Sequence, residues 1–103
     1  MSFTGNENHD IDLNDAAKMT KDYRIANPGE ILGGFFGKDA IEAILAQEGC
    51  VGIRYYHALT EDGKRTIVLV GAKEDQNDIV DGKIADYTVP DPPGSSLPNP
   101  LNS

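Results

Sequence analysis

The chain has 103 residues, of which 39% are hydrophobic and 25% charged, a composition typical of one ordinary globular domain. No apolar run approaches the ~20 residues that cross a bilayer. The first residues are polar and acidic, so we expect neither a membrane span nor a secretory signal, and we expect a cytoplasmic location. The net charge of −8 disfavours nucleic acids and anionic membrane surfaces as partners.

The prolines set the expected domain limits. Five of the six lie at or beyond Pro90, in a stretch without apolar periodicity, so residues 90–103 are predicted to be a disordered or extended tail. The PxxP spacing of Pro90 and Pro93 leaves a polyproline II ligand as an alternative. Residues 1–10 are expected to be flexible, which leaves one domain over residues 11–89.

A first helix is predicted over residues 13–26. Asp12 followed by Asp15 is typical of a capped N-terminus, and Pro28 disfavours helical geometry at the residue before it. The apolar stripe of this helix is thin and rich in alanine, which favours close packing on a neighbouring element.

The glycine-rich residues 29–37 are predicted to form a connection that anchors Phe35 and Phe36 in the core. A second helix is predicted over residues 38–48, because its apolar residues fall on one face and Gly49 follows at the position where a left-handed terminus is favoured.

The period then changes to that of β-strands, and we predict a hairpin over residues 50–73 with a two-residue turn at Asp62 and Gly63. This turn would pair Leu59 with Thr66, so that each strand contributes one set of side chains to each face. One face would then be apolar, with Val51, Ile53, Tyr55, His57, Leu59, Val68, Val70 and Ala72. The other face would be mixed, with Gly52, Arg54, Tyr56, Ala58, Ile67, Leu69 and Gly71.

A two-stranded hairpin is marginal alone, so we expect residues 84–89 to supply a short third strand with Ile84, Tyr87 and Val89. The predicted fold class is α+β, with two helices packed on a small antiparallel sheet.

No catalytic or metal-binding motif stands out. Cys50, the single cysteine, and His57 lie too far apart on one extended strand to form a nucleophile and its base. We therefore predict no catalytic residues, no metal and no cofactor, and favour a protein that is not an enzyme.

The residues best suited to binding are planar donors and aromatic rings, which often anchor recognition surfaces. We predict Tyr23, Arg24, Arg54, Tyr56 and Leu69 as binding residues. Arg54 and Tyr56 point to the same side of the first strand. A structural role is an alternative for Arg54, in an ion pair with an acidic side chain of the first helix such as Asp22.

Several short runs resemble a group of small uncharacterised bacterial proteins. The runs are Phe35-Phe36-Gly37-Lys38, Ile44-Leu45-Ala46-Gln47, Gly49 to Tyr56, Glu61-Asp62-Gly63-Lys64 and Val68-Leu69-Val70-Gly71, together with Tyr23-Arg24. The resemblance covers about half of the chain and implies a bacterial origin. It implies no activity and no residue role.

Two hypotheses on function remain. The first is a non-catalytic interaction or accessory protein that binds another protein, or associates with itself, through the mixed face of the hairpin. The second is a protein that binds a small molecule or an anion, or a small enzyme, with its site between residues 29–37 and the side chains of Arg54 and Tyr56.

Overall fold

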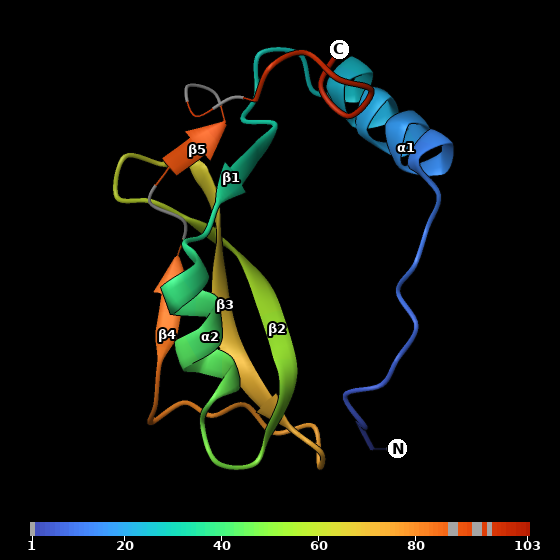
Figure 1. The fold of residues 1–103 in the computed structure, drawn as a ribbon. Helices are drawn as coiled ribbons and strands as arrows, with labels where there is room; N and C mark the ends of the chain where they lie inside the picture. Colours follow the sequence, from blue (N-terminus) through green and yellow to red (C-terminus); the bar gives the residue numbers. More distant parts are fainter. Residues whose placement is uncertain (1, 87–88, 92–93, 95) are drawn as a thin grey trace. The chain divides into compact units, whose positions relative to one another are not determined.

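A computed structural model describes residues 2–86, 89–91, 94 and 96–103 of the chain. These residues form two compact units that interleave along the sequence. The first unit contains the N-terminal residues to Glu7 and the segment Phe36–Thr88, and the second contains Asn8–Phe35 and Val89–Ser103. Figure 1 gives the order of the elements. The one domain over residues 11–89 stays a prediction.

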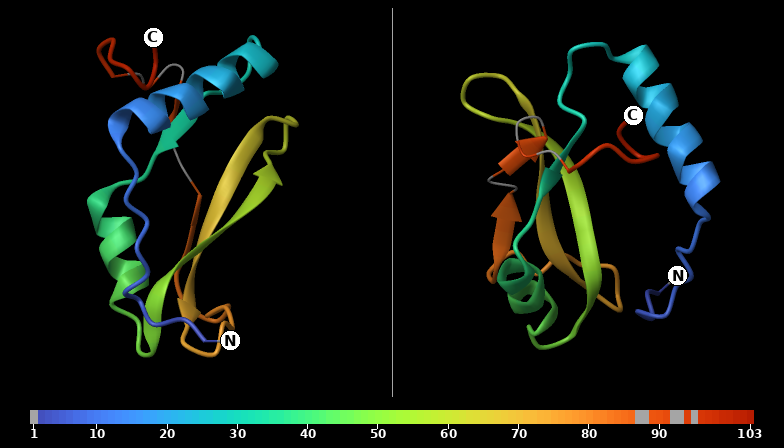
Figure 2. Two further views of the ribbon diagram at one scale, coloured as in Figure 1. Left: turned by 90° about the vertical axis from the view of Figure 1, so that its right-hand side faces the viewer. Right: turned by 45° about the horizontal axis from the view of Figure 1, so that its top comes forward.

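Helix α2, Lys38–Leu45, covers one face of the sheet in the first unit (Figures 1 and 2). Ile44 is its buried residue, with 1% of its surface exposed. The predicted helix is confirmed, but it ends three residues before the predicted residue 48. The side chain of Gln47 donates to the carbonyl of Ile44 at 2.9 Å and so terminates the helix, and Gly49 adopts a left-handed conformation with φ 79°.

The hairpin consists of β2, Cys50–Leu59, and β3, Arg65–Lys73. Its turn differs from the predicted one, because the backbone N–H of Thr60 donates to the carbonyl of Lys64 at 2.8 Å. Three residues therefore form the loop, and the last of them, Gly63, is left-handed with φ 82°. A three-residue loop with a left-handed glycine at its end is a common hairpin connection.

The longer loop moves the pairing by one residue from the predicted register. Leu59 lies opposite Arg65 instead of Thr66, and Tyr55 lies opposite Leu69. A shift of one residue exchanges the faces of a whole strand, so the predicted division of β3 between the two faces is wrong. One face carries Ile53, Tyr55, His57, Leu59, Arg65, Ile67, Leu69 and Gly71; the other carries Gly52, Arg54, Tyr56, Ala58, Thr66, Val68, Val70 and Ala72.

The third strand, β4, Ile84–Asp86, pairs antiparallel with β3 and completes a sheet of order β2-β3-β4. The prediction of a third strand from Ile84 is confirmed. Its predicted end is wrong, since Val89 belongs to a strand of the second unit, and Tyr87 lies outside the described residues.

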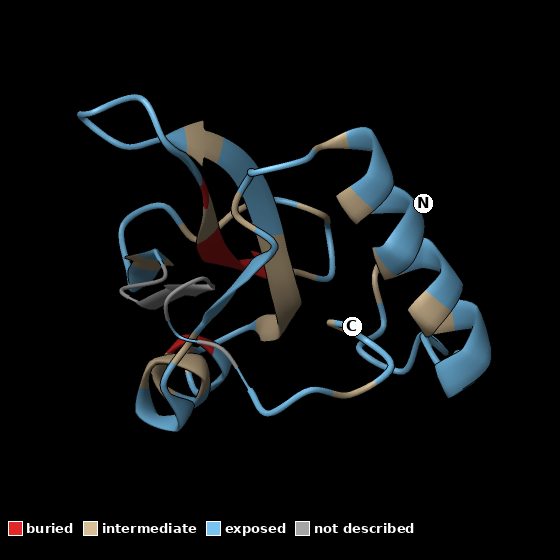
Figure 3. Cartoon of the chain, turned by 90° about the horizontal axis from the view of Figure 1, so that it is seen from above, coloured by how far each residue is buried: buried red, intermediate tan, exposed pale blue. Residues whose placement is uncertain are grey.

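The core of the first unit includes residues from both faces of the sheet. Ile44, Leu69, Val70 and Ala72 are its buried hydrophobic residues, and Figure 3 marks them in red. Strand β3 lies in the middle of the sheet, and it has buried residues on both of its faces. The α+β class predicted from the sequence is confirmed.

The second unit contains helix α1, Leu13–Ala26, with the predicted bounds. Asp12 caps it by accepting from the backbone N–H groups of Asn14 and Asp15 at 2.7 and 3.2 Å. None of its residues is buried.

Two short strands complete this unit. Strand β1, Gly33–Phe35, pairs antiparallel with β5, Val89–Asp91. Phe35 is exposed, so the prediction that it anchors in the core is wrong; Phe36 is half-buried. Pro90 lies within β5, and Pro93 lies outside the described residues.

Candidate functional site

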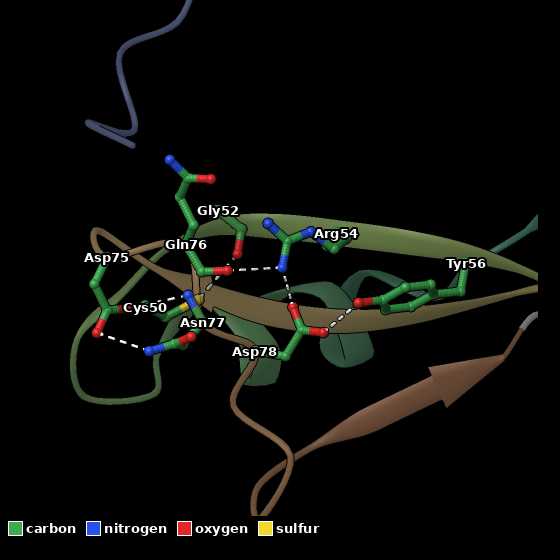
Figure 4. Close-up of polar contacts among 8 residues, drawn as sticks. All are labelled: Cys50, Gly52, Arg54, Tyr56, Asp75, Gln76, Asn77 and Asp78. Carbon is green, nitrogen blue, oxygen red and sulfur yellow. Dashed lines mark hydrogen bonds and ion pairs between the residues drawn. The ribbon is translucent and has the colours of Figure 1, made fainter. Parts of the chain in front are cut away.

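The face of the sheet opposite α2 carries a cluster of polar side chains around Asp78 (Figure 4). The guanidinium of Arg54 donates through Nη1 to one carboxylate oxygen of Asp78, and the hydroxyl of Tyr56 donates to the other. The same Nη1 atom donates to the carbonyl of Gln76 at 2.8 Å. Arg54 and Tyr56 come together because they stand two residues apart on β2, and an isolated bridge between Asp78 and Ala72 brings the carboxylate to them.

The N-terminal segment lies against this cluster. The ring of Phe3 stacks on the guanidinium of Arg54, with 5.4 Å from Cζ to the ring centroid. The backbone N–H of Phe3 donates to the carbonyl of Glu74 at 2.8 Å, which fixes the segment beside the turn that follows β3. Gln76 in this turn has a φ of 74°, rare for a residue other than glycine.

The hydrogen bonds of the cluster shift the pKa values of its members. The pKa of the Asp78 carboxyl is lowered, because the Tyr56 hydroxyl and then the Arg54 guanidinium stabilise its charged form. The same contacts raise the pKa of Tyr56 and that of Arg54, each chiefly through its hydrogen bond to Asp78. The cluster thus holds a carboxylate, a neutral phenol and a guanidinium around neutral pH.

We expect Asp78→Asn to lower the melting temperature at pH 7 by several degrees, because the amide loses the ion pair and leaves one donor of the cluster poorly matched. The pKa of Asp78 is lower in the folded chain, so its stabilisation is present above the carboxyl's ordinary pKa. It is lost as the pH falls through the lowered value. Thermal unfolding from pH 7 to pH 2 should therefore show the two melting curves converging in acid. A difference that stays constant over this range would contradict the assignment.

The structure changes the expected roles of two predicted binding residues. The predicted alternative of an ion pair between Arg54 and Asp22 is wrong, since Arg54 pairs with Asp78 while Asp22 pairs with Lys18 at 2.8 Å. Leu69 is buried, with 7% of its surface exposed, on the face that α2 covers. It lies on the opposite face from Tyr56, so the two do not share the predicted mixed surface.

Tyr23 and Arg24 belong to the second unit. The Tyr23 hydroxyl donates to the carbonyl of Ile31 at 3.4 Å. Arg24 donates to the carbonyl oxygens of Leu101 and Ser103 at 2.8 and 3.0 Å, which ties α1 to the end of the chain. Within this unit both side chains therefore have structural partners.

The residues of the alternative small-molecule site are divided between the units. Gly29 to Phe35 belong to the second unit and Arg54 and Tyr56 to the first. An anion at Arg54 would have to displace the carboxylate of Asp78, which already accepts from both donors. The arrangement suits the attachment of a turn to a sheet better than the capture of an anion.

Two exposed apolar side chains of the hairpin lie on the other face, the one that α2 covers in part. Tyr55 and Leu59 are 58% and 70% exposed. The His57 ring stands edge-on to that of Tyr55, with centroids 5.5 Å apart. His57 is exposed. A hollow of about 360 Å³ at this end is lined by His57, Ala58, Leu59, Arg65 and Thr66.

The described part of the chain holds no group of three or more His, Cys, Asp or Glu side chains arranged to bind a metal ion. None of its helices is long and apolar enough to cross a membrane. No family model matches the sequence, and neither a curated protein nor a solved structure matches it. The resemblance to small bacterial proteins stays a prediction.

Proposed function

We propose that this chain is a small non-catalytic interaction protein, and that it binds a protein surface through the uncovered end of its hairpin. We call this end the outer hairpin face and define it by Tyr55, His57, Leu59 and Ile67. The observation that carries the proposal is the exposure of Tyr55 and Leu59 on the same face as the buried Leu69. The face is thus continuous with the core but extends beyond the helix that covers it.

The chemistry of this face supports binding to protein. Tyrosine offers a large apolar area with few rotatable bonds, and aromatic residues are enriched among the residues that contribute most to protein interfaces. Leu59 and the half-buried Ile67 add aliphatic surface beside it. An apolar patch on a small acidic chain is unfavourable in water, and a partner that covers it removes that cost.

The hairpin is also held in shape before any partner binds. The pairing of β2 with β3 runs without interruption from Gly52 to Leu59. Arg54 and Tyr56 attach β2 to the turn at Asp78 from the other face. A preformed strand loses less conformational freedom on binding than a loop would, which favours affinity.

We expect Leu59→Glu to weaken partner binding at least about tenfold, since it places a charge in the apolar patch. The matched control is Val80→Glu, which introduces the same charge in place of an aliphatic side chain that is equally exposed but lies outside the face. Wild-type and variant chains are immobilised and exposed to an extract of the native host. Any retained protein is purified and titrated against all three chains, and self-association is measured in parallel.

A partner, or a second copy, that binds the wild type and Val80→Glu equally and Leu59→Glu more weakly supports the proposal. If neither self-association nor any captured protein depends on Leu59, the proposal is wrong.

A further inference from the structure

The outer edge of β2 lies beside the outer hairpin face. In the sheet order β2-β3-β4, β2 is an edge strand, and it is ten residues long. Among the described residues, no backbone group bonds to this edge from Ile53 to Leu59. The backbone of the N-terminal segment meets the strand at its beginning, where Gly5 lies against the carbonyl of Val51, and Phe3 contacts the side chain of Arg54 on the Asp78 face.

The hydrogen-bonding pattern shows which residues direct their backbone outward. The N–H of Thr60 bonds to Lys64, so in an antiparallel pair the even-numbered residues of β2 bond to β3. The carbonyl of Gly71 accepts from the N–H of Ile79, on the side of β3 away from β2, which agrees with this alternation. The outward residues of β2 are therefore Ile53, Tyr55, His57 and Leu59. Three of these four residues, Tyr55, His57 and Leu59, also belong to the outer hairpin face.

Edge strands of soluble monomers usually carry a device against pairing, such as a proline, a charged side chain, a bulge or a short length. From Ile53 to Leu59 β2 has no proline, and its bulge lies before this stretch, between Cys50 and Gly52. Its one charged residue, Arg54, is paired with Asp78 on the far face. The edge is therefore left open to another strand.

We propose that this edge pairs with β2 of a second copy, antiparallel across a two-fold axis, so that two three-stranded sheets join into one. The inference rests on the proposed function and names its partner. With the two-fold axis beside Tyr56, Tyr55 of each copy lies opposite His57 of the other copy. Ile53 of each copy then lies opposite Leu59 of the other. This register uses every outward residue of the stretch and places no two charged side chains opposite each other.

The charges at the two ends of the hairpin favour the antiparallel direction. The tip carries two acidic and two basic residues, Glu61, Asp62, Lys64 and Arg65. The other end carries three acidic residues and one basic, Glu48, Lys73, Glu74 and Asp75. Parallel strands would place the two acidic ends together, whereas antiparallel strands place each acidic end beside a neutral tip with Lys64 and Arg65.

Amide hydrogen exchange of the wild-type chain tests this pairing directly. At micromolar concentration the amides of Arg54, Tyr56 and Ala58 should be protected by β3, while those of Tyr55, His57 and Leu59 exchange fast. At millimolar concentration we expect the second set to slow at least about tenfold, together with a doubling of mass in light scattering. A chain that stays monomeric, with fast outward amides at every concentration, would overturn the inference.

A proline at residue 57 separates edge pairing from contact by the side chain. His57→Pro removes an N–H that makes no bond to β3, and proline is tolerated on an edge strand. We expect it to weaken the dimer at least about tenfold, while His57→Ala, which keeps the N–H, weakens it less. Far-ultraviolet circular dichroism checks that both variants are folded. Equal weakening by both variants would also overturn the inference, and if His57→Pro does not fold, the wild-type exchange pattern decides.

The two proposals can fail separately. A monomeric chain that binds a different protein through Leu59 refutes the pairing of two copies and leaves the proposed function standing. A chain that shows neither dimer nor Leu59-dependent binding refutes both.

Discussion

Ile44→Ala is expected to lower the free energy of unfolding of the first unit by about 2–5 kcal/mol, the usual cost of truncating a fully buried aliphatic side chain. Ile44 is the most buried large side chain of the described chain and the buried residue of α2. The core that it joins has few other members, so little is available to fill the cavity. Because small domains are stable by only about 5–15 kcal/mol, this loss is a large fraction of the total.

Leu45→Ala is the matched control, since it makes a similar truncation one residue along the same helix at an exposed side chain. We expect it to cost about 0.5 kcal/mol or less. Urea unfolding followed by circular dichroism measures both changes. Equal effects of the two variants would mean that α2 does not place Ile44 against the sheet.

The helices were predictable because their signals are local. Asp12 and Pro28 each lie within one turn of the end of α1 that they determine, and both predicted bounds are confirmed. The last residue of α2 was harder to predict from the sequence, because the helix is terminated by a hydrogen bond from the side chain of Gln47. That side chain bonds back to Ile44 and also accepts from the backbone N–H of Lys83, 36 residues away. Such a distant contact leaves no local pattern.

The register of the hairpin was missed for a different reason. An Asp-Gly pair favours a two-residue turn when it stands alone, but here Thr60 changes the outcome. Its hydroxyl donates to the carboxylate of Asp62 and accepts from the backbone N–H of Lys64 at 3.0 Å. These bonds support the wider loop, and a threonine two residues before the aspartate is the signal that could have indicated it.

The site was predictable in part. The two-residue period of β2 placed Arg54 and Tyr56 on one side, as the structure confirms. Their partner Asp78 could not be identified, because it lies 24 residues after Arg54, in an isolated bridge that follows the turn with the left-handed residue Gln76. The exposure of Tyr55 and Leu59 depends on how α2 lies on the sheet, and a tertiary contact of this kind cannot be read from the pattern of one strand.

Gly71→Val is expected to lower the free energy of unfolding by about 1–3 kcal/mol, the usual cost of overpacking a core. A Cβ at residue 71 would stand 3.0 Å from the Sγ of Cys50, 3.0 Å from the Nε2 of Gln47 and 3.3 Å from a methyl of Ile79. The two further methyl groups of valine need still more room. Gly71 therefore lets Gln47, which follows the end of α2, approach β3 closely.

Gly52→Val provides the matched comparison, because a Cβ there meets no atom within 4 Å and valine favours strands. Urea unfolding should show a loss for Gly71→Val and little change for Gly52→Val. The close approach at Gly71 holds α2 over the base of the hairpin, and this position leaves Tyr55 and Leu59 uncovered. If Gly71→Val is as stable as the wild type, α2 is not held at that distance, and the boundary between the covered and the exposed parts of the hairpin is not fixed by this contact.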